Sequence, residues 1–154
     1  MKAIRINHIA ISCTDLAKSL DFYIGIFGME RIPTYNFGIP VQYLRIGKQQ
    51  LHVFEYPAET VPFRQHFAID VDDFGAVYRA AKERGALCFD AFDNCMYELP
   101  DGAMQMYLRD PSGNLVEVDW PDIKTLDLSQ FPEAKKLADK NPQTGENLLA
   151  TLYE

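Results

Sequence analysis

The feature that most constrains the fold is an internal repeat, because short segments of the first half recur in the second. His8–Ile11 (HIAI) matches His66–Ile69 (HFAI) 58 residues later, and Tyr43–Arg45 (YLR) is identical to Tyr107–Arg109 after 64 residues. Self-similarity of this kind is the signature of a chain built from copies of one supersecondary unit. We therefore expect two equivalent modules in this chain.

The first half has the pattern of a β-α-β-β-β module. Alternating apolar residues predict a strand over Ile4–Ser12. Apolar residues at helical spacing then predict an amphipathic helix, with Thr14 or Asp15 as its N-cap and Gly28 as its C-cap. Three further strands are predicted, over Glu30–Tyr35, Val41–Ile46 and Gln49–Tyr56.

The second half repeats this order. It begins with a strand over Gln65–Val71 and a helix that Asp72 or Asp73 caps and Gly85 ends. The next strands are predicted at Leu87–Phe89, Met96–Leu99, Ala103–Leu108 and Asn114–Trp120. The predicted fold class is α+β, with a domain over residues 1–120 that contains module one at about 4–56 and module two at about 63–120. Residues 121–154 form an extension with a short helix predicted at Pro132–Asp139, and we expect it to dock on the domain or, alternatively, to cover the site.

Composition excludes several classes of function. The 154 residues are 47% hydrophobic and 24% charged, as in ordinary globular domains. The net charge of −7, with no basic cluster, makes nucleic acid and anionic membranes poor partners. No apolar run is long enough for a membrane span and no signal-peptide pattern is present, so we expect a cytoplasmic protein. Three cysteines without a CxxC pair predict neither a disulfide framework nor a zinc knuckle.

All three histidines of the chain fall at positions that the repeat makes equivalent. His8 aligns with His66 and, with one residue inserted in the preceding turn, His52 aligns with Glu117. Their strand neighbours on the opposite face are apolar and would pack against the helices, which leaves the His and Glu side chains on one shared face. An isolated histidine in a strand is usually structural, but this matched set predicts a metal site. Imidazole and carboxylate ligands suit Fe, Mn, Co, Ni or Zn rather than Ca or Mg.

Several segments of the sequence resemble the vicinal oxygen chelate superfamily, which includes glyoxalase I, extradiol dioxygenases, methylmalonyl-CoA epimerase and fosfomycin-resistance proteins. The resemblance covers about residues 4–120. It lies in His8 on the opening strand, in DLAKSLDFYIGIFGM (15–29), in QHFAIDVDD (65–73) and in YLRDPSGNLVE (107–117).

The resemblance implies a glyoxalase/dioxygenase-like fold, in which two βαβββ modules form a U-shaped mixed sheet around a divalent metal. It implies His8, His66 and Glu117 as metal ligands, with His52 at the variable fourth position. It also implies a small-molecule substrate that binds through two neighbouring oxygens. We expect a homodimer.

Three functions remain open at this point. We favour an Fe(II) dioxygenase acting on a vicinal-dioxygen substrate such as a catechol or hydroquinone, in which His52 moves protons and Tyr107 orients the substrate. The alternative is a metal-assisted lyase or isomerase of the glyoxalase or epimerase type, with Ni, Co, Zn or Mn as other possible metals and His52 as a ligand or base. A non-catalytic binding protein of the bleomycin-resistance type is the third.

Departures from the family patterns bear on this choice. The arginine that glyoxalase I uses on glutathione corresponds to Ser12, and the histidine that opens the extradiol dioxygenase pattern would fall near Glu98. The closing part of that dioxygenase pattern is present between Met106 and Glu117. Residues that could line a substrate cavity, or simply pack, are Tyr35, Phe37, Tyr97, Glu98 and Trp120.

Overall fold

The structure is a computed structural model that describes residues 5–58 and 60–153. Ile4, where the first predicted strand begins, and Glu154, the last residue of the extension, lie outside the described residues. The chain divides into two compact units. Unit 1 contains the described residues up to Gln65 together with Asp110–Asn114, and unit 2 contains His66–Arg109 and the described residues from Leu115 onward.

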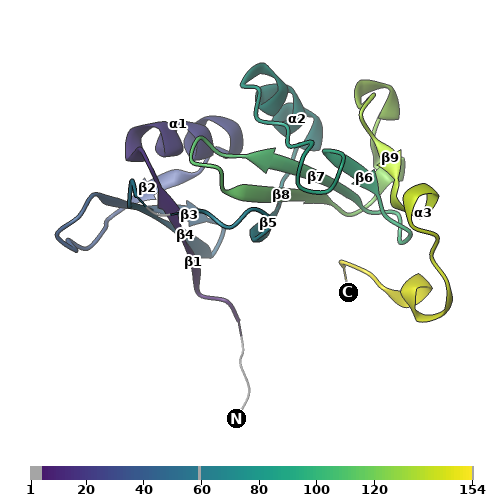
Figure 1. Cartoon of the computed structure of the whole chain (residues 1–154), viewed down its shortest axis with the longest axis horizontal. Helices are drawn as coiled ribbons and strands as arrows, with labels where there is room; N and C mark the ends of the chain where they lie inside the picture. Colours follow the sequence, from purple (N-terminus) through teal and green to yellow (C-terminus); the bar gives the residue numbers. More distant parts are fainter. Residues whose placement is uncertain (1–4, 59, 154) are drawn as a thin grey trace, which may run out of the picture. The chain divides into compact units, whose positions relative to one another are not determined.

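Unit 1 is a β-α-β-β-β module, as the sequence predicts. Its four strands form a sheet of order β1-β4-β3-β2, in which β1 pairs with β4 in parallel and the other pairs are antiparallel (Figure 1). Its elements are β1 (His8–Cys13), α1 (Leu16–Phe27), β2 (Glu30–Ile32), β3 (Val41–Ile46) and β4 (Gln49–Glu55).

Helix α1 begins and ends at the residues that the sequence singles out. The Asp15 side chain accepts a hydrogen bond from the Lys18 backbone, and Gly28 ends the helix with a φ of 62°, a conformation that glycine adopts without steric cost. The apolar face of α1 is buried and the helix contacts β4, whose Leu51 and Val53 are fully buried. Their strand neighbours Gln50 and His52 therefore lie on the face of the sheet opposite α1.

Unit 2 repeats the module and extends it. Its sheet has the order β5-β8-β7-β6-β9, so that the segment after Trp120 adds a fifth strand beside β6 (Figure 1). Its strands and α-helices are β5 (His66–Asp70), α2 (Phe74–Glu83), β6 (Met96–Glu98), β7 (Met104–Arg109), β8 (Leu115–Trp120), β9 (Lys135–Lys136) and α3 (Leu137–Lys140), with short 3-10 helices at Ile123–Thr125, Leu128–Gln130 and Gly145–Leu149. The fold class is α+β, as predicted.

The C-terminal segment docks on unit 2. Phe131 is buried edge-on against Phe74 and Tyr78 of α2. Farther along, the Tyr153 hydroxyl donates to Asp70 Oδ1 at 2.7 Å. The helix predicted at Pro132–Asp139 is wrong in its bounds, because Lys135 and Lys136 pair with the edge of β6 before α3 begins. That free strand edge is a tertiary feature that overrides local helix propensity.

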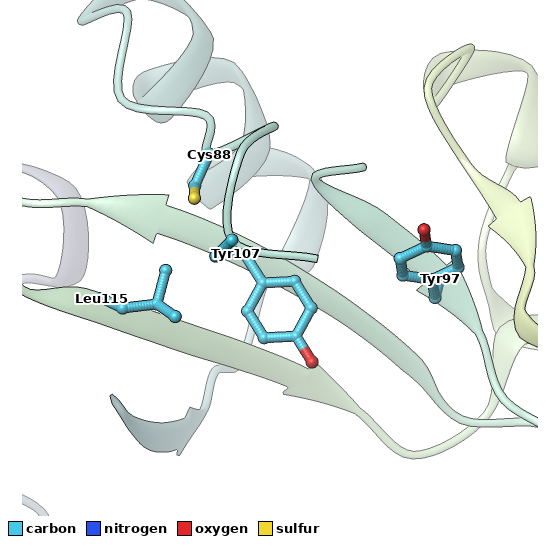
Figure 2. Packing of buried hydrophobic residues seen from close by; sticks show 5 residues of the cluster. Cys88, Tyr97, Tyr107 and Leu115 are labelled. Carbon is cyan, nitrogen blue, oxygen red and sulfur yellow. The ribbon is translucent and has the colours of Figure 1, made fainter. Parts of the chain in front are cut away.

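The segment between α2 and β6 also differs from its prediction. Leu87–Phe89 is not a regular strand, since Leu87 makes only an isolated bridge to Leu108. Residues of this segment instead pack against side chains of the sheet in a buried cluster (Figure 2). The cluster contains Cys88, Ala91, Tyr97, Tyr107 and Leu115. No helix within the described residues is long and apolar enough to span a membrane.

Candidate metal centre

Unit 1 contributes two of the four predicted ligands, and their rings are stacked. His8 begins β1, and His52 lies at the middle of β4, where it pairs in register with Ala10 and Tyr43. The His8 and His52 ring centroids are 4.2 Å apart with an interplanar angle of 12°. On its other side His52 stacks on Tyr43, at 3.5 Å and 6°. His52 is therefore held between two rings, whereas His8 lies at the exposed end of the stack.

Each of these histidines has an amide partner on a neighbouring residue. Asn7 Oδ1 lies 3.0 Å from His8 Nδ1, and Gln50 Oε1 lies 2.8 Å from His52 Nε2. Burial, and then the proximity of His8, lowers the pKa of His52, so its imidazole is neutral at pH 7. With Gln50 accepting the Nε2 proton, the free lone pair of His52 is on Nδ1, where it can accept a proton.

Unit 2 contributes the other two predicted ligands, which point at each other. His66 begins β5, and Glu117 lies on the adjacent parallel strand β8, buried to 4% exposure. His66 Nε2 and Glu117 Oε2 are 3.0 Å apart. Two ligand atoms that each bind one ion at about 2.1 Å, with a right angle between them, are about 3 Å apart. The 3.0 Å separation is that of a direct His–carboxylate pair, and the same two atoms have the chemistry and spacing to be ligands of one divalent metal.

Gln105 and Tyr107 support the Glu117 carboxylate from the neighbouring strand β7. Gln105 Nε2 donates to Glu117 Oε1 at 2.5 Å, and the Tyr107 hydroxyl donates to Gln105 Oε1 at 3.3 Å. Tyr107 pairs in register with Glu117, and its ring packs against Phe92. Burial and the Glu117 carboxylate raise the pKa of Tyr107 above its usual range, so the phenol stays protonated.

Asp119 adds a second carboxylate two residues after Glu117. Its Oδ1 is the buried side-chain oxygen that has no hydrogen-bond partner within the described part of the chain. Burial, followed by the charge of Glu117, raises the pKa of Asp119 to about 8. Asp119 is therefore mostly protonated at neutral pH.

The structure thus brings the predicted ligands together in two pairs, His8 with His52 in unit 1 and His66 with Glu117 in unit 2. Considered within each unit, the described residues contain no group of three or more His, Cys, Asp or Glu side chains that could hold a metal. Sequence reasoning missed Asn7, Gln50, Gln105 and Asp119. Three of them, Gln50, Gln105 and Asp119, are polar residues in apolar strands, on the face that carries the ligands.

Gln105 gives a first test of this arrangement. Gln105→Met keeps the side-chain length but removes the donor that orients Glu117, and we expect divalent metal binding to weaken by about 10-fold to 100-fold. Competition with a metal-sensitive dye measures this affinity. Gln130→Met, which changes a surface glutamine bonded to Arg79, is the matched control. Equal affinity of the Gln105 variant and the wild type would show that this hydrogen bond does not position a ligand.

Comparison with known proteins identifies a family whose model matches most of the chain. A family model described as the Glyoxalase/Bleomycin resistance protein/Dioxygenase superfamily matches residues 5–118. Among curated protein sequences, none matches the chain.

Solved structures with the same fold have several different functions. The oxidase ChaP-H2 is 25% identical, with a TM-score of 0.63 over 77% of this chain and 94% of that chain. Lactoylglutathione lyase from Agrobacterium tumefaciens is 24% identical, with a TM-score of 0.55 over 82% of this chain and 100% of that chain. The fosfomycin resistance protein of Listeria monocytogenes is 16% identical, with a TM-score of 0.59 over 77% of this chain and 93% of that chain.

Proposed function

The chain belongs to the glyoxalase/bleomycin resistance protein/dioxygenase superfamily, and from that premise we propose that it is a metal-dependent enzyme whose ion is held by His8, His66 and Glu117. The observation that carries the proposal is the 3.0 Å approach of His66 Nε2 to Glu117 Oε2. A histidine and a carboxylate directed at one point, with a further histidine at the matched position of the other module, make a two-histidine, one-carboxylate donor set. This set suits Fe(II) and leaves positions open for substrate and O₂.

His52 is better suited to moving protons than to holding the ion. Imidazole binds a metal through a lone pair that lies in the plane of its ring. The His8 and His52 rings are nearly parallel and 4.2 Å apart, so an ion in the plane of one ring lies outside the plane of the other. His8 is the more exposed of the two and can turn toward an ion, whereas His52 is held by Tyr43 and Gln50. We assign His52 as the acid-base group.

We propose Fe(II)-dependent oxygenation of a substrate with two neighbouring oxygens, such as a catechol. When bound, the ion supplies a common attachment point for substrate and O₂. His52 Nδ1, kept unprotonated by burial, takes the proton that a substrate hydroxyl releases on binding. Gln105 holds Glu117 in its ligating orientation, and Tyr107, bonded to Gln105, orients the substrate beside it. The 25% identity to an oxidase supports oxygen chemistry. The proposal includes a cytoplasmic homodimer.

The second candidate is a metal-assisted lyase or isomerase. The unprotonated Nδ1 of His52 supports it, because this atom can act as the base for proton transfer. In this candidate a His52 ring released from its stack with Tyr43 would instead be a fourth ligand. The two candidates differ in whether the reaction consumes O₂ and in whether replacement of His52 lowers the metal content.

Oxygen uptake separates them. Protein purified without oxygen and loaded with Fe(II) is expected to consume O₂ when catechols are added. His52→Gln should keep the iron and lose at least 100-fold of the uptake rate, since it removes the proton acceptor. The control is Glu98→Gln, which changes a carboxylate of β6 that pairs with Lys136. It should leave both the iron content and the rate of oxygen uptake unchanged. Loss of metal in His52→Gln, together with turnover that needs no oxygen, would replace the dioxygenase by the lyase or isomerase.

A further inference from the structure

Unit 1 carries a continuous band of aromatic side chains beside His52. It consists of Tyr35, Phe37, Tyr43, Phe54 and Tyr56, and is here called the aromatic wall. Tyr43 comes from β3, Phe54 from β4, Tyr56 from the residue after β4, and Tyr35 and Phe37 from the loop between β2 and β3. Because Tyr43 pairs with His52, and Phe54 lies two residues farther along β4, the wall shares the face of the candidate metal site.

The rings contact one another in a series that starts at the metal-site end. Tyr43 lies face to face with His52. Phe37 follows at 6.3 Å from Tyr43 and 5.6 Å from Phe54, and Phe54 is stacked with Tyr56 at 6.2 Å. Tyr35 meets both Tyr43 and Phe37 edge-on, at 6.4 Å in each case. These separations lie within the range of favourable aromatic pairs, so another flat ring can join the series.

Much of the outer part of the wall is open. Tyr35 is 77% exposed, Phe37 51% and Tyr56 44%, whereas Tyr43 beside His52 is buried. The loop that carries Tyr35 and Phe37 is nevertheless held in place, since Thr34 accepts from the Tyr43 backbone and Asn36 accepts from the Gly38 backbone. An exposed group of large aromatic rings on an anchored loop is a feature of ligand sites rather than of an ordinary surface.

The length of the wall bears on the size of the ligand. His52 and Tyr56 are four residues apart along one extended segment, which corresponds to about 13 Å. A single ring held by two oxygens at the metal, beside His52, would leave the more distant rings of Phe54, Phe37 and Tyr56 uncontacted. A molecule of two or more fused rings would continue along the wall.

We propose that the substrate class of this site is a planar, fused-ring phenol whose oxygens meet the metal and whose far rings stack on the aromatic wall. This inference rests on the proposed function for the role of the metal, but the stacking itself involves only residues of the wall. Binding of the far rings can therefore be measured without metal, without oxygen and without turnover.

The experiment compares naphthol with phenol as probes on metal-free full-length protein, by calorimetric or fluorescence titration. We expect naphthol to bind at least 10-fold more tightly than phenol. Phe37→Ala and Tyr35→Ala should each reduce that preference by about 10-fold or abolish it, because each removes one aromatic partner. Phe37→Leu, which keeps an apolar side chain and so protects the fold, should show an intermediate loss. Phe89→Ala changes an equally exposed ring of unit 2 and should have no effect.

The proposal would be overturned if phenol and naphthol bound with equal affinity. It would also be overturned if Phe89→Ala lost as much of the preference for naphthol as Phe37→Ala. A third result would also overturn it: the wild type binds no naphthol but self-associates, and Phe37→Ala abolishes the self-association. The aromatic wall would then be the contact to a second copy of the chain. If naphthol binds as expected but the protein takes up no metal, the proposed function fails and the aromatic site stands.

Discussion

Glu117→Gln is expected to weaken divalent metal binding by more than 100-fold. The substitution keeps the shape of a buried side chain but replaces its charged oxygen, which lies 3.0 Å from His66 Nε2, with a neutral amide. Loss of a hydrogen bond that only orients a ligand costs about 10-fold to 100-fold in affinity, and loss of the charged ligand itself costs more. Elemental analysis after exhaustive dialysis, together with a dye competition titration, measures the effect.

The control for this variant is Glu98→Gln, which neutralises a carboxylate of the same sheet that pairs with Lys136 on the strand edge. Its metal content should match that of the wild type. Circular dichroism on both variants separates loss of the ligand from loss of the fold. Undiminished metal binding by a folded Glu117→Gln protein would remove this carboxylate from the ligand set.

Asp110→Ala should lower the free energy of unfolding by about 4 kcal/mol, the largest stability effect that we expect from one substitution. Asp110 is buried at the start of the Asp110–Asn114 turn, and its carboxylate accepts four hydrogen bonds. The donors are the backbone amides of Ser112 and Asn114, the side-chain amide of Asn114, and the hydroxyl of Tyr23 on α1. Alanine leaves all four donors without this acceptor.

Chemical denaturation measures this loss, which corresponds to roughly a 1,000-fold smaller ratio of folded to unfolded protein. Tyr23→Phe removes only one of the four bonds and should cost about 1 kcal/mol. Burial and the Asp110 carboxylate both raise the pKa of the Tyr23 phenol, so the hydroxyl remains a donor across the working pH range. Asp72→Ala, at an exposed position before α2, should be neutral within about 0.5 kcal/mol. A cost for Asp110→Ala as small as that of Asp72→Ala would contradict the assigned role.

The parts of the fold that the sequence predicts correctly are those that local chemistry determines. Strand β3 has the predicted bounds, Val41–Ile46, because its alternating pattern is bounded by Pro40 and by the Gly47 turn. Asp15 and Asp73 are the N-caps of α1 and α2. Each carboxylate accepts a hydrogen bond from the backbone amide three residues later, so no distant residue is needed. The parallel pairing of β1 with β4 recurs as that of β5 with β8, in keeping with the repeat.

The errors fall where distant parts of the chain decide the conformation. Leu87–Phe89 is apolar enough for a strand, but it makes a single bridge to β7 and Cys88 packs into the buried cluster with Tyr97 and Tyr107. Lys135 and Lys136 pair with β6 only because that edge is open, and no local pattern indicates this.

In the candidate site, too, the local sequence pattern predicts some features, whereas contacts with distant residues decide the others. Strand alternation places His52 and Glu117 on the sheet faces opposite Leu51, Val53, Val116 and Val118, whose burial fixes the register. The partners of the ligands were not identified, since a glutamine such as Gln105 has no distinctive spacing and gains its role from the strand opposite. The aromatic residues Tyr35 and Phe37 were considered as lining residues, but their contacts with Tyr43 and Phe54 depend on how the loop folds back.

The central proposal is that His8 of unit 1 and the His66–Glu117 pair of unit 2 hold a single ion. The most direct test is the stoichiometry of metal binding in the wild type, His8→Ala and His66→Ala, measured by titration and by elemental analysis of the same samples. The account predicts one ion per chain in the wild type and loss of that ion in either variant, although the two histidines belong to different units. Metal retained at full occupancy in either folded variant, or no uptake of Fe(II), Mn(II), Co(II), Ni(II) or Zn(II) by the wild type, would contradict it.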